Sequence, residues 1–166
     1  KKKFADDLNR GVIGVQTDNC FNLNKYKAYQ ELNSDLKKVA YVESVLSVTN
    51  AANLTKDTAT QKLIAVPVFP AQIQSQQQLD SCRKLLYSLL FYKSLLYNPT
   101  TNSFLAAVSI NKDILNSPGR TKVIDNIISA TNNYTAKTNI PTHISGLPLI
   151  RTQVADRIAR EMKWFI

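Results

Sequence analysis

Hydrophobic and polar residues follow two periodicities along the chain, one typical of helices and one typical of strands. Val12 to Thr17 is a short β-branched run that predicts a strand. After a turn signal, apolar residues recur at spacings of three and four, which predicts an amphipathic helix. Its core positions are Tyr26, Tyr29, Leu32, Leu36 and Val39. Alternation from Val42 to Val48 predicts a second strand, so residues 12–49 form a β-α-β unit.

A second unit of the same plan occupies residues 102–148. Phe104, Ala106, Val108 and Ile110 alternate as a strand. Ser117 and Pro118 predict the N-cap and first position of a helix that ends near Asn139, before Pro141. The apolar face of this helix comprises Val123, Ile124, Ile127, Ile128, Thr131 and Tyr134. Thr142 to Leu147 is the fourth predicted strand.

Residues 50–101 are interpreted as an insertion between the two units. Thr49 to Gln61 is rich in Thr, Asn and Ala and is predicted to be a loop. Lys62 to Pro70 is extended, and its two prolines exclude a central position in a sheet. Gln72 to Tyr97 is predicted to be one long helix that ends at Asn98-Pro99. Its apolar face carries Leu79, Cys82, Leu86 and Leu89.

The order β-α-β, insertion, β-α-β predicts an α+β chain of the ferredoxin-like, split βαβ type. Helices would cover one face of an antiparallel sheet, and residues 1–166 would form one domain. The formal net charge of +9 suits an anionic partner such as nucleic acid, acidic lipid or an acidic protein. The two cysteines, Cys20 and Cys82, have no metal-site spacing and are expected to be independent thiols, with a single disulfide between them as the alternative.

Residues 149–166 predict a final helix whose apolar residues recur every four positions: Ile150, Val154, Ile158 and Met162. Arg157, Arg160 and Lys163 lie beside Trp164 and Phe165, a composition typical of a membrane–water boundary. The alternative is an amphipathic helix packed on its own domain. Because the chain starts with three lysines and its one methionine is Met162, we expect a fragment that ends where a transmembrane helix begins.

Enzyme signatures are missing from the sequence. His143 is the sole histidine, and no G-x-S-x-G, H-E-x-x-H, C-x-x-C or phosphate-binding glycine pattern occurs. We therefore expect neither catalysis nor a cofactor or metal. Base stacking on a ferredoxin-like sheet requires aromatic residues on two strands, whereas the strand 103–110 carries one aromatic residue, at its start. Nucleic acid is consequently not the expected partner.

Three segments carry a resemblance to a known family. Tyr41 to Val48 (Y-V-E-S-V-L-S-V) resembles the "gV-x-x-V-x-S" segment of the resistance-nodulation-division (RND) exporters, in particular their MMPL-type branch. Leu95 to Leu105 is similar to that branch's helix end, Asn-Pro pair and following strand. Ser145, Gly146 and Pro148 resemble its "sG-x-P" turn, which precedes the second transmembrane helix.

The resemblance implies a porter domain on the periplasmic side of the bacterial inner membrane, between the first two membrane helices of an exporter. Its partners would be a hydrophobic or lipid substrate, a second porter domain of the same polypeptide and, through flanking helices, the membrane; homo-oligomerisation stays open. Phe69, Phe91, Tyr92 and Tyr97 are candidates for lining a hydrophobic cleft, although core packing is the preferred interpretation. The alternative function is a free-standing basic domain that binds nucleic acid or an acidic protein.

Overall fold

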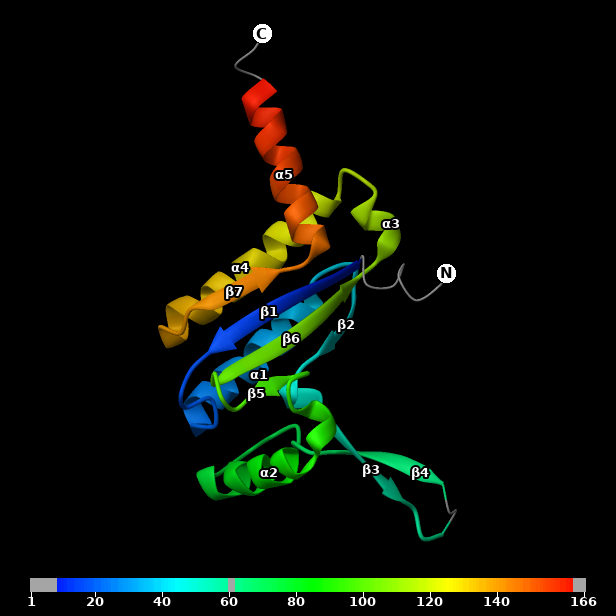
Figure 1. Ribbon diagram of the computed structural model, residues 1–166, viewed down its shortest axis with the longest axis vertical. Coiled ribbons are helices and arrows are strands. Elements are labelled where there is room, and N and C mark those ends of the chain that lie inside the picture. Colours follow the sequence, from blue (N-terminus) through cyan, green and yellow to red (C-terminus); the bar gives the residue numbers. More distant parts are fainter. Residues whose placement is uncertain (1–8, 60–61, 163–166) are drawn as a thin grey trace.

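The computed structural model describes residues 9–59 and 62–162, and it confirms a mixed architecture of helices and antiparallel sheets. The main sheet has the strand order β2-β6-β1-β7, and all its pairings are antiparallel. These strands are β1 (Arg10–Gln16), β2 (Val42–Leu46), β6 (Ser103–Ile110) and β7 (Thr142–Ser145). Helices α1 (Leu23–Lys38) and α4 (Arg120–Thr138) lie together behind this sheet in Figure 1.

The two covering helices form where the apolar periodicity predicts them. Asn22 caps α1, since its side-chain oxygen accepts a hydrogen bond from the Asn24 backbone N–H at 3.1 Å. Helix α4 ends at Asn139, which adopts the left-handed conformation (φ 55°) common after a helix C-terminus. The buried positions of α4 are Val123, Ile124, Ile127, Thr131 and Tyr134, which confirms the predicted face.

Strand β6 is the central strand of the core. Phe104, Ala106, Val108 and Ile110 are buried beneath the helices, and the alternate residues are partly exposed on the opposite face. This confirms the alternation read from the sequence. Burying such a side chain contributes roughly 1.5–3 kcal/mol, several times the 0.2–0.5 kcal/mol of an exposed helix charge pair. The inward-facing residues of the sheet therefore determine which way it faces.

The insertion differs from its predicted structure in two places. Residues 49–61 are not a loop throughout, because β3 (Ala52–Lys56) pairs antiparallel with β4 (Leu63–Pro67) in a two-stranded ribbon. The composition of this segment did not predict β3, because its strand structure depends on pairing with the apolar β4. As predicted, the proline-containing segment occupies no central position in a sheet, since a two-stranded ribbon has only edges.

The prediction of one long helix over residues 72–97 is also wrong, because the helix ends halfway along this segment. Helix α2 covers Gln76–Ser88 only, and a short 3₁₀ helix, η3 (Leu90–Tyr92), follows it. The chain then turns at Ser94, where φ is 66°, and forms the short strand β5 (Tyr97–Asn98) beside β6. After the turn, Leu96 and Tyr97 are buried in the core.

Several predicted boundaries move for local reasons. The fourth strand, β7, ends at Ser145 and not at Leu147, because the last helix already begins at Leu147 and not at residue 149. Strand β2 ends at Leu46 because the Ser47 hydroxyl caps another 3₁₀ helix, η2 (Val48–Asn50). Helix α4 starts at Arg120, after a short helix α3 (Lys112–Leu115), and not at Pro118. The Ser117 hydroxyl donates to the Ile114 carbonyl at 2.9 Å and accepts from the Gly119 N–H at 3.2 Å, so it stabilises the turn between the helices and not the start of α4.

An aromatic cluster fastens the insertion to the main body. Phe21 stacks on Phe69 (6.2 Å between ring centroids) and meets Phe104 of β6 edge-on (5.4 Å). Tyr26 of α1 stacks on the same Phe69, at 5.2 Å. The segment after β4 thus packs against both α1 and the sheet, while the β3–β4 ribbon itself extends away from the body (Figure 1).

Candidate functional site

The principal candidate site is an open cleft between β3 and residues 88–92, which we call the ribbon cleft. It has a volume of about 450 Å³ and is lined by Ala52, Asn53 and Leu54 of β3 and by residues 88–92. A volume of this size lies in the range of small-ligand sites. Phe91 and Leu90 border the cleft with 76% and 74% of their side chains exposed, so apolar surface is presented to solvent here.

Tyr92 fixes one wall of the cleft. Its hydroxyl accepts a hydrogen bond from the Ala52 N–H at 3.0 Å and donates one to the Ala52 carbonyl at 2.7 Å. One side chain therefore satisfies both backbone groups of a strand residue, as a neighbouring strand would. Tyr92 also holds η3 against β3, and Phe91 of η3 and Leu54 of β3 both line the cleft.

The backbone of β3 continues past Tyr92 with an unpaired edge. The Val68 N–H donates to the Ala51 carbonyl, and the Asp57 N–H donates to the Lys62 carbonyl, both at 2.9 Å. Because hydrogen-bonded and non-hydrogen-bonded pairs alternate in an antiparallel ladder, Ala52, Leu54 and Lys56 direct their N–H and C=O groups to the outer edge. Within the described part of the chain, Tyr92 pairs with Ala52, whereas Leu54 and Lys56 have no backbone partner on that edge.

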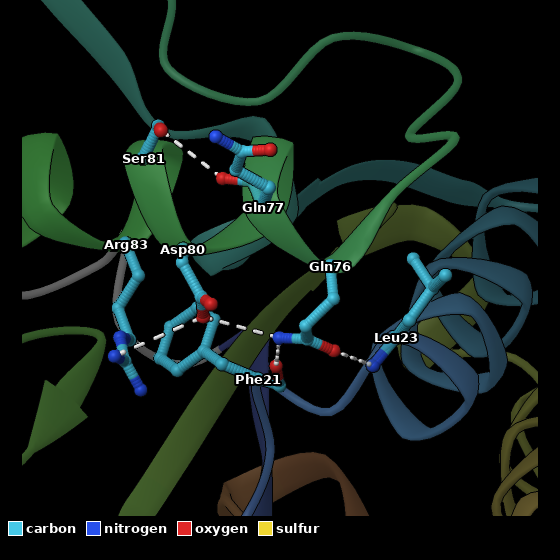
Figure 2. A network of polar contacts seen from close by, with 7 residues as sticks. All are labelled: Phe21, Leu23, Gln76, Gln77, Asp80, Ser81 and Arg83. Carbon is cyan, nitrogen blue, oxygen red and sulfur yellow. Dashed lines mark hydrogen bonds and ion pairs between the residues drawn. The ribbon is translucent and has the colours of Figure 1, made fainter.

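Side-chain hydrogen bonds attach α2 to the start of α1 and so fix the position of α2 against the main body (Figure 2). The Gln76 amide donates to the Phe21 carbonyl at 2.7 Å, and its oxygen accepts from the Leu23 N–H at 2.9 Å. The same amide donates to Asp80, which also lies 3.8 Å from Arg83. These polar groups have structural partners and offer no acid or nucleophile to the cleft.

The four aromatic candidates separate into two groups. Phe69 and Tyr97 are each only 3% exposed, so both are core residues and cannot meet a ligand from solvent. Phe91 and Tyr92 both line the ribbon cleft. Leu54 and Leu90 also line the cleft, and neither was among the residues predicted to do so. The alternation A-N-L-T-K over residues 52–56 was the one available signal, and it is short and weak.

The turn formed by Ser145, Gly146 and Pro148 sets the direction of the last helix, α5 (Leu147–Met162). Gly146 has φ of +126°, a conformation that only glycine adopts readily. A Cβ at this position would lie 2.6 Å from the Arg10 carbonyl oxygen, so the turn packs directly on the β1 backbone. Leu149 and Thr152 are buried beside it, and the start of α5 is thereby anchored to the sheet and α4.

Beyond its first turns, α5 leaves the body of the molecule (Figure 1). Ile150, Val154, Ile158 and Met162 form an apolar stripe whose members are 49% to 60% exposed. Arg157 and Arg160 are also exposed on α5, whereas Lys163, Trp164 and Phe165 lie outside the described residues. In the described ranges no helix is both long enough and apolar enough to cross a membrane. The helix therefore has an apolar side that its own domain does not cover.

The sheet face opposite the helices carries mostly small and aliphatic residues. The pairings place Leu105, Gly14 and His143 in one row and Leu46, Ala107, Val12 and Ser145 in the next. Neither row contains Phe, Tyr, Trp, Lys or Arg. His143 is exposed at the end of its row, which gives this face one ring and no second stacking platform.

The titratable groups with shifted pKa values are structural. Burial raises the pKa of the Cys20 thiol to about 12 and the pKa of Tyr134 to about 12, and it also raises the pKa of Tyr26 and Tyr29. A raised thiol pKa lowers the thiolate fraction and with it nucleophilic reactivity. Among residues 9–59 and 62–162, no three side chains of His, Cys, Asp or Glu are grouped so that they could hold a metal ion.

Comparison with known proteins adds no assignment to this geometry. The chain matches none of the known family models and none of the curated proteins.

Proposed function

We propose that this chain is a periplasmic, extramembrane domain of an RND exporter of the MMPL type, which moves lipids or other hydrophobic compounds. It neither catalyses a reaction nor binds a cofactor, and it shapes the substrate path together with a second porter domain. In this proposal the fold is a ferredoxin-like split βαβ sandwich, and the strand order β2-β6-β1-β7 supports that assignment.

The observation that carries the proposal is the course of α5. A helix that merely completed its own domain would bury its apolar stripe, yet the stripe of α5 faces solvent. Arg157 and Arg160 lie in the C-terminal half of α5, between the last residues of the stripe. Basic side chains are typically found at the level of lipid headgroups. We therefore assign α5 as the connection to the membrane. The predicted membrane-proximal residues Lys163, Trp164 and Phe165 follow directly in the sequence, outside the described residues.

Phe91 is the aromatic candidate best placed to meet a hydrophobic cargo, because it is the most exposed of the four. The competing function, a basic domain that binds nucleic acid on its open sheet face, receives less support. That face offers no pair of aromatic platforms, and stacking on such platforms contributes about 1–3 kcal/mol per base.

A topology experiment on the natural gene product tests the proposal. The product should fractionate with the inner membrane and require detergent for extraction. Protease added to spheroplasts should cleave it within this domain, whereas intact cells should protect it. Recovery of the product in the soluble fraction, or protection of the domain until spheroplasts are lysed, would refute the proposal.

A further inference from the structure

We propose that the outer edge of β3 and the adjoining ribbon cleft bind an extended segment of a partner protein, with alternating apolar side chains and at least one carboxylate. The inference goes beyond the exporter assignment and does not rest on it, because it concerns the end of the molecule opposite α5 (Figure 1). Three observations support it: a backbone edge with an open position, an apolar cleft beside that position, and unpaired positive charge around both.

The backbone edge is already used once as a pairing edge. The Tyr92 hydroxyl bonds both polar groups of Ala52, so this position is filled by a side chain that imitates a neighbouring strand. The next position along the edge, Leu54, directs the same two groups outward beside the cleft. An added strand that starts beyond Tyr92 would pair with Leu54 and then with Lys56.

The cleft supplies a place for a side chain of the added strand. Successive side chains of a strand point to opposite faces of the sheet, so every second residue of the segment would face Phe91 and Leu90. The volume of about 450 Å³ accepts a large aliphatic or aromatic side chain without rearrangement. Phe91, which is 76% exposed, would gain the most from being covered.

The charge around the cleft favours an acidic partner. Residues 50–101 contain five basic and two acidic residues. Of the described side chains, Lys56, Lys62 and Lys93 are exposed with no ion pair, while Asp80 is engaged by Gln76 and Arg83. A second copy of this chain would bring like charges together. A plain acyl chain would cover the Leu54 N–H and C=O without replacing their hydrogen bonds to water, which costs free energy.

The probe for this inference is a seven-residue peptide, Asp-Val-Thr-Val-Thr-Val-Asp, blocked at both ends and added to the isotope-labelled chain. We expect saturable shifts around the cleft and amide exchange slowed by about tenfold or more at Leu54 and Lys56 when the peptide is in excess. Replacing the central Val of the peptide by Pro removes a required donor and should abolish binding. Replacing both Asp by Lys should weaken it severalfold.

Two matched variants separate the cleft from nonspecific binding. Phe91→Ala removes an exposed aromatic anchor and should weaken the peptide by about fivefold or more, the effect typical of a central interface residue. Ile150→Ala, on the exposed stripe of α5, should leave the peptide affinity unchanged. Because both side chains are largely exposed, both variants should fold normally, and circular dichroism checks this.

Four outcomes would overturn the inference. The first is equal binding of the proline peptide, and the second is protection of the Leu63 and Ala65 amides on the β4 edge in place of the β3 amides. The third is amide protection that rises with protein concentration in the absence of peptide. The fourth is binding of the hydrophobic dye Nile red in the cleft while the peptide fails to bind. The third would indicate a second copy of the chain as the occupant. The fourth would leave the exporter proposal standing, since hydrophobic cargo is then the cleft's ligand. Conversely, a failed topology experiment would leave a positive peptide result valid.

Discussion

Replacing Gly146 with alanine should be among the most destabilising single changes at the surface of this domain. Gly146 connects β7 to α5 and combines two constraints, a φ of +126° and direct packing on the β1 backbone. A Cβ there would lie 2.6 Å from the Arg10 carbonyl oxygen and 2.9 Å from the Gly11 Cα. Both obstacles are backbone atoms of a strand in the middle of the sheet, so neither can move aside cheaply.

The magnitude follows from these two constraints. A backbone conformation that side-chain-bearing residues rarely adopt costs about 1–3 kcal/mol. Relieving the contact requires β1 and the turn to separate, which also disturbs the Ile150 N–H bond to the Gly146 carbonyl (3.1 Å) at the base of α5. We expect a total loss of about 2–4 kcal/mol, a large fraction of the 5–15 kcal/mol typical of a domain. The urea midpoint should fall by about 1–2 M.

Gly14→Ala is the matched control because Gly14 lies on the same strand, β1, and an added Cβ there would make only ordinary van der Waals contacts with Leu105 and His143. The nearest atoms to an added Cβ there are 3.7 Å away, and φ is not in the left-handed region. This change should be neutral or stabilising by up to about 0.5–1 kcal/mol. Equal loss in the two variants, or a neutral Gly146→Ala, would refute the argument that the turn is held by close packing on β1.

Three further predictions follow from other parts of the molecule. Tyr92→Phe removes the hydroxyl that satisfies Ala52 and should cost about 1–2 kcal/mol in urea unfolding, whereas Phe91→Ala should change the free energy of unfolding by less than about 0.5 kcal/mol. Burial raises the pKa of the Cys20 thiol from 9.0 to about 12, so between these pH values the unfolded chain releases this proton first. The free energy of unfolding should therefore fall by up to about 1.4 kcal/mol per pH unit above pH 9, and Cys20→Ala should reduce that slope in urea series at pH 8 to 11. Under the proposed exporter function, Trp164→Ala in the natural gene product should impair export, measured in cells, more than it impairs folding of this domain, and equal export would count against the proposed membrane role of that residue.

Periodicity predicted the elements whose burial is determined by one repeating face. Strand β6 alternates over its whole length because one side packs under helices, and α4 keeps one apolar face over its whole length for the same reason. Asn139 and Pro141 marked the end of α4 because each limits the backbone locally. In such segments, local sequence and tertiary packing favour the same structure, so the element could be predicted from one sequence.

The insertion resisted prediction because its structure depends on contacts between distant residues. Strand β3 is stabilised by β4 across a turn and by Tyr92, which lies 40 residues away in sequence. The helix expected after Ser88 is replaced by a turn at Ser94, after which Tyr97 pairs with Phe104 of β6 and both Leu96 and Tyr97 are buried. The ribbon cleft is a product of this folding, so the sequence indicated Phe91 and Tyr92 as candidates but neither Leu54 nor the free edge beside it.

The two exposed apolar surfaces lie at opposite ends of the molecule, and this separation constrains what each can do (Figure 1). A single partner of ordinary size could cover the stripe of α5 or the ribbon cleft, but the body of the domain lies between them. If α5 meets the membrane as proposed, the ribbon cleft points away from the bilayer, so a ligand would reach it from the aqueous side (Figure 1). The edge of β3 offers backbone N–H and C=O groups that can form hydrogen bonds with an extended polypeptide but not with a lipid tail. The geometry thus favours a division of roles, with lipid at α5 and polypeptide at β3. A variant that impaired both membrane association and peptide binding without unfolding the domain would contradict that division.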